Sequence, residues 1–351
     1  MRFLESLPHW GNIAVFCAGA VVVWLAGTRL SRGADAIADR TGLGQAFVGA
    51  LLLGGTTSLP EIAATVSASL ILNAPIAVNN IFGGIAMQVT ILAMADALGR
   101  GALTGRNRHP GVLLEGTLLI LVLNTAAVGI AVGDTAVLGV GLWTAGVLIL
   151  VGIGLFLIKH YEAHPRWQPS DEPRSGPGDE QTRRAKERRE RFRSASTRAL
   201  AVRMTLASLA VLAGGFAVAK SGERIAEQTG LGASFVGAIL IAVATSLPEV
   251  STTLEAVRLG ARVMAISNIF GTNLFDAGLL FVADVFYPGP PVLNEVGRFA
   301  QVGALLGIAC TTIYLAGILE RRDKTFLRLG MDSLLVLAVY GGGVALLYAI
   351  R

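Results

Sequence analysis

Residues Thr41–Glu61 read TGLGQAFVGALLLGGTTSLPE, and residues Thr229–Glu249 read TGLGASFVGAILIAVATSLPE. The second stretch lies 188 residues after the first. At the same spacing, NNIFGG in Asn79–Gly84 is followed by SNIFGT in Ser267–Thr272. Two matches at one offset are not expected by chance, so the sequence predicts that its two halves are copies of one unit.

The composition around these stretches is typical of a membrane protein. Of the 351 residues, 53% are hydrophobic and 15% are charged, whereas about 25% are charged in an average soluble domain. The mean hydropathy is +0.62, and apolar runs of about 20 residues, long enough to cross a bilayer as helices, recur along the chain. These features exclude a disordered chain, a disulfide scaffold and an ordinary soluble enzyme.

Ten apolar runs are predicted to cross the membrane, which makes the expected fold an all-α polytopic membrane protein with ten transmembrane helices. They cover residues 10–28, 44–72, 76–97, 111–132, 136–158, 199–219, 232–257, 263–286, 299–319 and 329–350. The first run follows Arg2 as a signal peptide could, but it has a counterpart in the second half and is therefore retained as a span.

Each copy of the unit contains five predicted spans, and an odd number makes the two copies enter the membrane from opposite sides. We expect a first five-helix repeat in residues 1–158, with its motif at 49–96, and a second in 199–351, with its motif at 237–284. Inverted-topology repeats of this kind share a site near the bilayer midplane, built from broken helices.

The basic residues predict the orientation. If the N-terminus is outside, most Lys and Arg residues fall in loops on the inner side, where positive charge is favoured. The exceptions among the 29 are Arg2, Lys220, Arg224, Arg298 and Arg351. We therefore expect a plasma (inner) membrane protein with both termini outside and the 159–198 loop in the cytoplasm.

The 159–198 loop carries the basic run RRAKERRERFR in Arg183–Arg193. It is expected to be a solvated linker that sets the topology, and the run could also contact anionic lipid headgroups. The net charge of +5 does not indicate nucleic acid as a partner, because it is placed in loops beside apolar spans.

For several other polar or reactive side chains, the sequence predicts a structural role and not a functional one. Cys17 and Cys310 lie in apolar runs and are expected to be small buried hydrophobic residues. Asp96, Asp284 and Glu115 lie near span ends and are expected to face the membrane interface. The histidines fall outside the spans, which argues against an intramembrane histidine metal site; they are His9, His109, His160 and His164.

Glu61 and Glu249 are the strongest functional candidates, because each copy places a glutamate inside its second span. An ionisable side chain at that depth costs at least a few kcal/mol and is a functional-site candidate by default. No Lys or Arg lies in the spans at that depth, so a structural ion pair is not expected.

The TSLPE motif places other oxygen atoms beside these glutamates. Pro60 lacks an N–H and is expected to break the helix and free the carbonyl near Thr56, while Pro248 does the same in the second copy. Thr57 and Glu61 lie four residues apart, on one helix face, as do their counterparts Thr245 and Glu249. An all-oxygen set suits Ca²⁺ and Na⁺ and is poor for zinc or copper.

The span that follows each motif differs between the copies. Thr272 and Asp276 lie four residues apart in copy two, where copy one has Gly84 and Gln88. Interhelical packing is expected for Asn80, Asn268, Gly83 and Gly271.

With these motifs the chain resembles the sodium/calcium exchanger branch of the calcium/cation antiporter superfamily. The resemblance rests on G-x-x-x-T-S-L-P-E followed by N-x-x-G-[ST]-N-x-x-[ND], found in both halves, and it covers nearly the whole chain. It implies a transporter rather than an enzyme, without a cofactor and functional as a monomer in the lipid bilayer, in which Ca²⁺ and Na⁺ or H⁺ compete at the centre. The ion-coordinating residues it implies are Thr57, Ser58, Glu61, Gln88, Thr245, Ser246, Glu249, Thr272 and Asp276.

Copy one departs from the motif at three positions. Gly84 stands where a hydroxyl residue is expected, Ile85 where Asn is expected, and Gln88 where Asn or Asp is expected. Alternatives to Ca²⁺ exchange against Na⁺ therefore stay open: an H⁺-coupled exchanger, an exporter of Mg²⁺ or Mn²⁺, and a passive cation channel. A membrane-embedded enzyme is not expected, because the sequence offers no nucleophile–base pair.

Overall fold

The computed structural model describes residues 8–98, 103–106, 109–164, 196–229, 245–320, 325–326 and 329–350, and these form a nearly all-helical fold. In this part of the chain, 8 helices are long and apolar enough to cross a membrane, and a bent helix pair raises the number to 9. Half of the predicted span 232–257 lies outside the described residues, so the count of ten spans stays a prediction.

The long helices recur in the same order in the two halves. The first half contains α2 (His9–Thr41), α5 (Leu59–Leu70), α6 (Ala74–Leu98), the short α7 (Leu103–Arg106), α8 (Pro110–Val132) and α9 (Leu142–Ala163). The second half contains α11 (Thr197–Gln228), α13 (Leu247–Arg258), α14 (Arg262–Phe286), α15 (Arg298–Glu320) and α16 (Met331–Ala349). Helices α13, α14 and α15 begin and end 188 residues after α5, α6 and α8, the offset of the sequence repeat.

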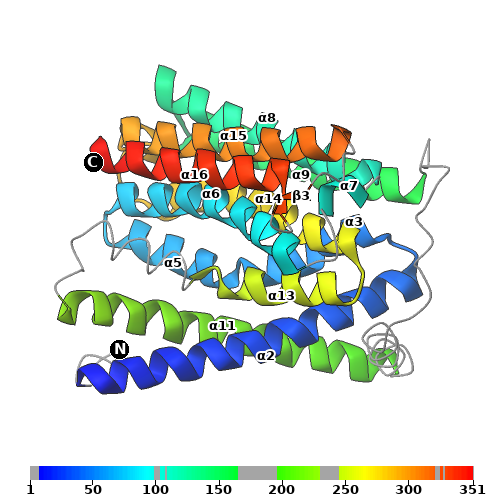
Figure 1. Cartoon of the computed structure of the whole chain (residues 1–351). Helices are drawn as coiled ribbons and strands as arrows, with labels where there is room; N and C mark the ends of the chain where they lie inside the picture. Colours follow the sequence, from blue (N-terminus) through cyan, green and yellow to red (C-terminus); the bar gives the residue numbers. More distant parts are fainter. Residues whose placement is uncertain are drawn as a thin grey trace.

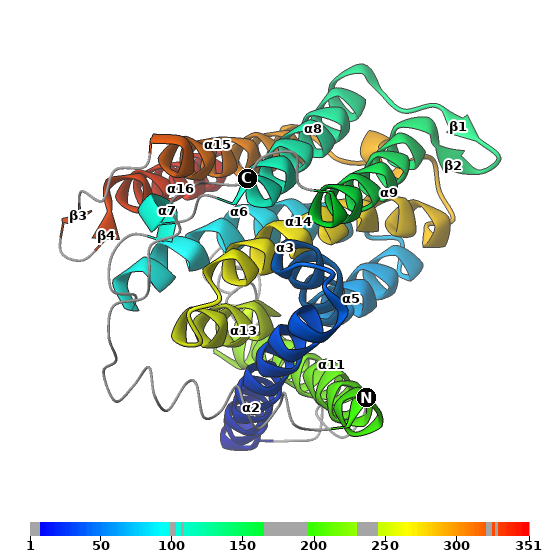
Figure 2. The same cartoon turned by 90° about the vertical axis from the view of Figure 1, so that its right-hand side faces the viewer.

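Helices α2 and α11 lie side by side along one edge of the molecule in both views (Figures 1 and 2). They run antiparallel, since His9 Nδ1 at the start of α2 lies 3.2 Å from Gln228 Oε1 at the end of α11. A Cβ atom at Gly19 would lie 3.2 Å from the carbonyl oxygen of Gly214, so small residues let the two helices approach closely. Helices α5 and α13 separate this pair from the other long helices (Figure 1).

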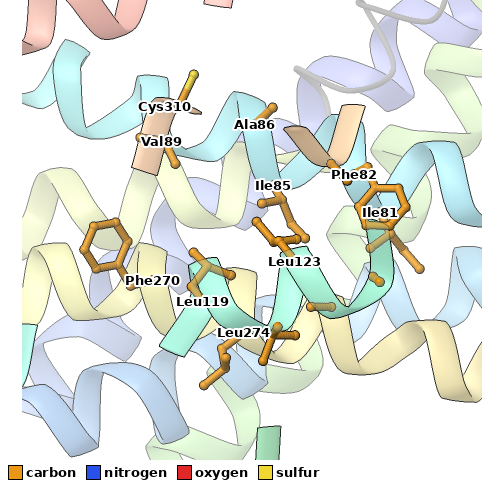
Figure 3. Packing of buried hydrophobic residues seen from close by; sticks show 14 of the residues in the cluster. Ile81, Phe82, Ile85, Ala86, Val89, Leu119, Leu123, Phe270, Leu274 and Cys310 are labelled. Carbon is orange, nitrogen blue, oxygen red and sulfur yellow. The ribbon is translucent and has the colours of Figure 1, made fainter. Parts of the chain in front are cut away.

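The apolar core lies on the other side of α5 and α13, between α6, α8, α14 and α15. Ile85, Leu119 and Phe270 come from three of these helices and are fully buried (Figure 3). The ring of Phe270 meets that of Tyr314 edge to face, with 6.0 Å between centroids. Cys310 is buried in this core as predicted, whereas Cys17 is exposed, because the face of α2 that carries it does not pack on α11.

Two short hairpins correct the expectation of an all-α chain. Strands β1 (Ala136–Val137) and β2 (Val140–Gly141) pair between α8 and α9, and β3 (Thr325–Phe326) and β4 (Leu329–Gly330) pair between α15 and α16. Leu138 and Gly139 turn the first hairpin with φ of 54° and 85°, as in a type I′ turn. Both hairpins lie in loops between helices. There the backbone N–H and C=O groups have no partner within a helix and pair with each other across the hairpin.

Asp284 is buried, contrary to the expectation that it faces the membrane interface. Its carboxylate accepts hydrogen bonds from Gly141 N–H and from Thr144 Oγ1, at 2.7 Å, at the start of α9, and from Val292 N–H at 2.8 Å. It therefore ties the end of α14 to the first turn of a helix from the other half.

Asp96, which is equally buried, makes the corresponding contacts from the end of α6. It accepts hydrogen bonds from Leu103 N–H at 2.6 Å, and from Gly330 N–H and Ser333 Oγ at the start of α16. Free N–H groups at a helix start favour a carboxylate acceptor. Two equivalent contacts thus join the halves. Asp96 of the first half binds the start of α16, and Asp284 of the second half binds the start of α9.

Candidate functional site

The first TSLPE motif lies where a helix is broken. Four segments follow one another: α3 (Gln45–Val48), a π-helical stretch η1 (Gly49–Gly54), α4 (Gly55–Thr57) and α5. The axis bends by 47° between Thr57 and Leu59, where Pro60 cannot continue the hydrogen-bond ladder of the preceding turn. In the second half α13 begins at Leu247 after a turn at Ser246, while residues 230–244 lie outside the described part.

Asp276 of α14 contacts two other predicted site residues. Ser58 Oγ donates to Asp276 Oδ1 at 2.8 Å, and Gln88 Nε2 donates to Asp276 Oδ2 at 3.1 Å. Gln88 and Asp276 are equivalent positions in the two copies, as are Ile85 and Asn273, whose amide donates to the Ile85 carbonyl at 3.3 Å. Equivalent residues therefore meet each other where α6 contacts α14.

Thr57 and Thr272 bring two further predicted residues together. Their hydroxyl oxygens lie 3.1 Å apart, and both side chains are fully buried. Each hydroxyl also lies within hydrogen-bonding distance of a carbonyl of its own helix, Thr57 with Leu53 at 3.1 Å and Thr272 with Asn268 at 2.7 Å. Both threonines thus combine helix back-bonding with a contact between the halves.

Glu61 and Glu249 are 7% and 0% exposed. Among the described residues, neither oxygen of Glu249 has a hydrogen-bond partner of good geometry, nor has Oε2 of Glu61, although Thr57 lies beside the Glu249 carboxyl group. Glu61 lies close enough to Glu249 and Asp276 to interact electrostatically with both, and among the described residues none of the three pairs with a basic side chain. Buried charge without compensation is costly, so this arrangement favours a cation or protons among the three carboxyl groups.

Besides carboxylate oxygens, this region contains neutral oxygen atoms that an ion can bind. Within the described ranges, no three His, Cys, Asp or Glu side chains lie as close together as the ligands of one metal ion. An ion held here would therefore need neutral oxygens as well, and Gln88 Oε1 is buried without a partner. Thr245 and Ser246 are buried at the equivalent break in the second half.

The structure tests the predicted close approach of helices at Gly271. A Cβ at Gly271 would overlap Ala50 of η1, so close helix approach is confirmed there. The residue equivalent to Ala50 in the second half is Ala238, which lies outside the described residues, so the same expectation for Gly83 stays a prediction.

Asn268 packs as predicted, while Asn273 was not singled out by the sequence analysis. The Asn268 amide donates to the hydroxyls of Thr252 at 2.8 Å and Thr253 at 2.9 Å, which ties α14 to α13. Asn273 is fully buried between the halves, and its Oδ1 has no partner. Its place in GTNLFD, where copy one has Ile85, was the available signal.

Taken together, fold and site define a multi-pass membrane protein with a buried cluster of carboxylate, hydroxyl and amide groups between two similar halves. The model of the sodium/calcium exchanger protein family matches residues 11–159 and 200–349, and the chain belongs to this family. It is accordingly a membrane transporter of inorganic cations and not an enzyme.

Several known proteins resemble the chain over different lengths. An uncharacterized membrane protein of Methanocaldococcus jannaschii is 22% identical over 325 residues, which covers 89% of this chain and 98% of the relative. The sodium/calcium exchanger MaX1 of Methanosarcina acetivorans is 38% identical over 64 residues, or 18% of each chain. A solved structure of the sodium-calcium exchanger NCX_Mj has the same fold, with a TM-score of 0.71, 20% identity, and coverage of 96% of this chain and 99% of that one.

Proposed function

We propose that the chain is a secondary antiporter that exchanges Ca²⁺ for Na⁺ or H⁺ by alternating access. The observation that carries this proposal is the pairing of Glu61 with Glu249, two buried carboxylates that have no basic partner in the part of the chain that the structure describes. Together they neutralise the charge of one Ca²⁺, and oxygen ligands are the ones Ca²⁺ prefers. Family membership and the NCX_Mj fold support the same activity.

The proposed ligand set is the one expected from the sequence. Ca²⁺ binds between Glu61 and Glu249, with neutral oxygens from Thr57, Thr245 and nearby backbone carbonyls. The remaining proposed ligands of the transported ions are Ser58, Gln88, Ser246, Thr272 and Asp276. Ca²⁺ and monovalent ions then exclude one another from a single acidic site, which couples their movements if the empty site does not change sides.

The proposed architecture is ten transmembrane helices in two inverted five-helix repeats, residues 1–158 and 199–351, joined by the cytoplasmic loop 159–198. The recurrence of helix bounds and the meeting of equivalent residues support it. The protein acts as a monomer in the plasma membrane, and the basic run of the loop contacts anionic lipid.

This orientation is tested with an impermeant thiol reagent in intact cells. Cysteines placed one at a time at Leu138, in the tight turn of the first hairpin, and at Ser196, after the basic loop, form a matched pair in a Cys17→Ser and Cys310→Ser background. We expect labelling at position 138 and none at 196 until the membrane is permeabilised. Labelling at position 196 and none at position 138 would show that the topology is the inverse of the one proposed.

Uptake of radioactive Ca²⁺ into proteoliposomes tests the function and identifies the counter-ion. A Na⁺ gradient and a pH gradient are imposed separately, with valinomycin and K⁺ clamping the voltage. Uptake driven by either gradient supports antiport and names the coupled ion. Uptake that ignores both gradients and follows only the Ca²⁺ gradient would instead indicate a channel.

The difference between Gln88 and Asp276 predicts where proton sensitivity of the site arises. Only Asp276 can bind and release a proton, so Asp276→Asn is expected to flatten the dependence of Ca²⁺ transport on pH while some Ca²⁺ binding persists. Transport is measured from about pH 6 to about pH 9, spanning the titration range of perturbed carboxyl groups. An unchanged pH profile with a higher apparent KM would mean that Asp276 is a permanently ionised ligand. Gln88→Asp adds negative charge and should shift the preference among cations.

A further inference from the structure

A second group of buried polar side chains lies away from the candidate ion site, at the end of α9. Glu115 of α8 is 1% exposed, and the side chain of Glu162 of α9 is 4% exposed. Neither oxygen of Glu115 has a hydrogen-bond partner. Ser267 of α14 lies beside the Glu115 carboxyl group, and its own buried hydroxyl has no partner of good geometry. The proposed function uses none of these groups.

Two glycines provide the space that Glu162 occupies. A Cβ at Gly44 would overlap its carboxyl group, and a Cβ at Gly111 would lie 2.8 Å from its Oε1. Gly44 has a φ of 79°, a conformation that favours glycine. The carboxyl group is thus enclosed by bare backbone at the starts of α3 and α8.

His109, at the start of α8, closes this group toward solvent, with 35% of its side chain exposed. Its Nδ1 accepts a hydrogen bond from Gly111 N–H at 3.2 Å. The same atom lies 3.5 Å from Glu162 Oε1. An imidazole nitrogen that accepts from Gly111 and an ionised carboxylate oxygen are both acceptors, so they repel unless one of them carries a proton.

We propose that His109, Glu162 and Glu115 form a second proton-binding site, separate from the ion site, that regulates exchange from the face of the 159–198 loop. One proton from water binds between His109 and Glu162. On Glu162 Oε1 it is donated to the single lone pair of Nδ1 in place of the Gly111 N–H; on Nδ1 it forms an ion pair with the carboxylate, and the Gly111 N–H is released as well. A second proton makes Glu115 a neutral acid beside Ser267.

The surroundings contain few other titratable groups among the described residues. Helix α9 adds Tyr161, which interacts electrostatically with Glu162, and α14 presents the neutral Ser267. Helix α3 presents Ala46 beside Gly111, and α15 presents Leu315 beside Gly116.

The second site can regulate exchange because it contacts the broken span that leads to the ion site. Glu162 packs against Gly44, where the broken span begins, and a Cβ at Gly49 of η1 would lie 3.0 Å from that of Ser267. The same span carries Thr57 and Ser58 to the ion site. A change of charge at the second site therefore acts on the first part of the broken span, at Gly44 and Gly49.

The test compares the wild type with Glu162→Gln, whose amide keeps the size of the side chain but binds no proton in this pH range. A group that titrates near pH 6.5 changes its proton-free fraction about fourfold between about pH 6 and about pH 8. With pH varied only on the loop side of proteoliposomes, we expect the Ca²⁺ transport rate of the wild type to change by up to that factor more than the rate of Glu162→Gln, which keeps only the pH response of Asp276. The control, His164→Gln, removes an exposed histidine from the same helix end and should keep the wild-type profile. Equal profiles for Glu162→Gln and the wild type would overturn the regulatory role.

Infrared difference spectra of the purified protein test proton binding without relying on transport. The wild type should show a carboxylic-acid band that changes between about pH 6 and about pH 8, the range of a histidine-coupled group. The band should lose intensity in Glu115→Gln and Glu162→Gln and persist in Asp276→Asn. A band unaffected by both glutamate variants would refute the second site. Because this inference rests on the proposed exchange only for its regulatory part, a wild type that moves no Ca²⁺ would refute the proposed function while the spectra still decide proton binding.

Discussion

Glu249→Gln is expected to lower Ca²⁺ transport at least about a hundredfold, which corresponds to about 3 kcal/mol. Among the described residues, both oxygens of Glu249 are buried without a hydrogen-bond partner of good geometry, so the substitution removes one of the two charges that would compensate Ca²⁺. An under-compensated ion in a buried site costs several kcal/mol. Glu61→Gln should have the same effect, because Glu61 lies within electrostatic range of Glu249. Initial rates of radioactive Ca²⁺ uptake into proteoliposomes measure the loss.

The control for this pair is Glu295→Gln, which removes an exposed carboxylate from the loop before α15. It should transport at the wild-type rate. Size-exclusion profiles must show that all variants are equally folded. Near-normal exchange by a folded Glu61→Gln or Glu249→Gln protein would remove the central role of these carboxylates.

Gly271→Ala is expected to cause the largest loss of stability among single methyl additions in this region. The new Cβ would overlap Ala50 and lie 2.8 Å from its carbonyl oxygen, and backbone cannot move aside as a flexible side chain can. Overpacking typically costs 1–3 kcal/mol, and we expect about 3 kcal/mol or more at this crossing of two backbones. Thermal unfolding of the purified protein, followed by tryptophan fluorescence, measures the effect.

Gly152→Ala, at an exposed position inside helix α9, is the control. Among the described residues its Cβ would meet nothing within 4 Å, and alanine is favoured over glycine in a helix interior by about 1 kcal/mol. We therefore expect an unchanged or slightly higher unfolding temperature. If the two alanine variants unfold alike, η1 and α14 do not approach each other as closely as described.

Much of the fold follows from the repeat. The TSLPE motif predicted a break in the second span, and the structure bends there by 47°. The offset of 188 predicted which helices correspond, and the helix bounds repeat at that spacing for α5, α6 and α8. These features are local or periodic, so a sequence contains them directly.

The predictions that failed concern which surface of a helix meets which neighbour. Asp96 was expected at the interface because it lies near a span end, but its partner Ser333 is distant in sequence and became visible only in three dimensions. Glu115 was misplaced for the same reason, since Ser267 approaches it from another helix.

Most of the candidate site could be predicted, because its residues recur in two motifs. Ser58, Gln88 and Asp276 were singled out from the repeat, and the structure joins them by hydrogen bonds at 2.8 and 3.1 Å. Asn273 was missed because copy one has an apolar residue at that position. Its contact with the Ile85 carbonyl depends on two helices meeting, which no local pattern encodes.

Equilibrium binding of radioactive Ca²⁺ to the purified protein, with Na⁺ titrated in at constant ionic strength, tests the central claim most directly. We predict that Ca²⁺ binds at a single class of site, that Na⁺ or protons displace it competitively, and that binding is lost in the Glu61→Gln, Glu249→Gln double variant and kept in Glu295→Gln. Ca²⁺ binding that survives in the folded double variant would contradict the account, because the paired buried glutamates would then not hold the ion.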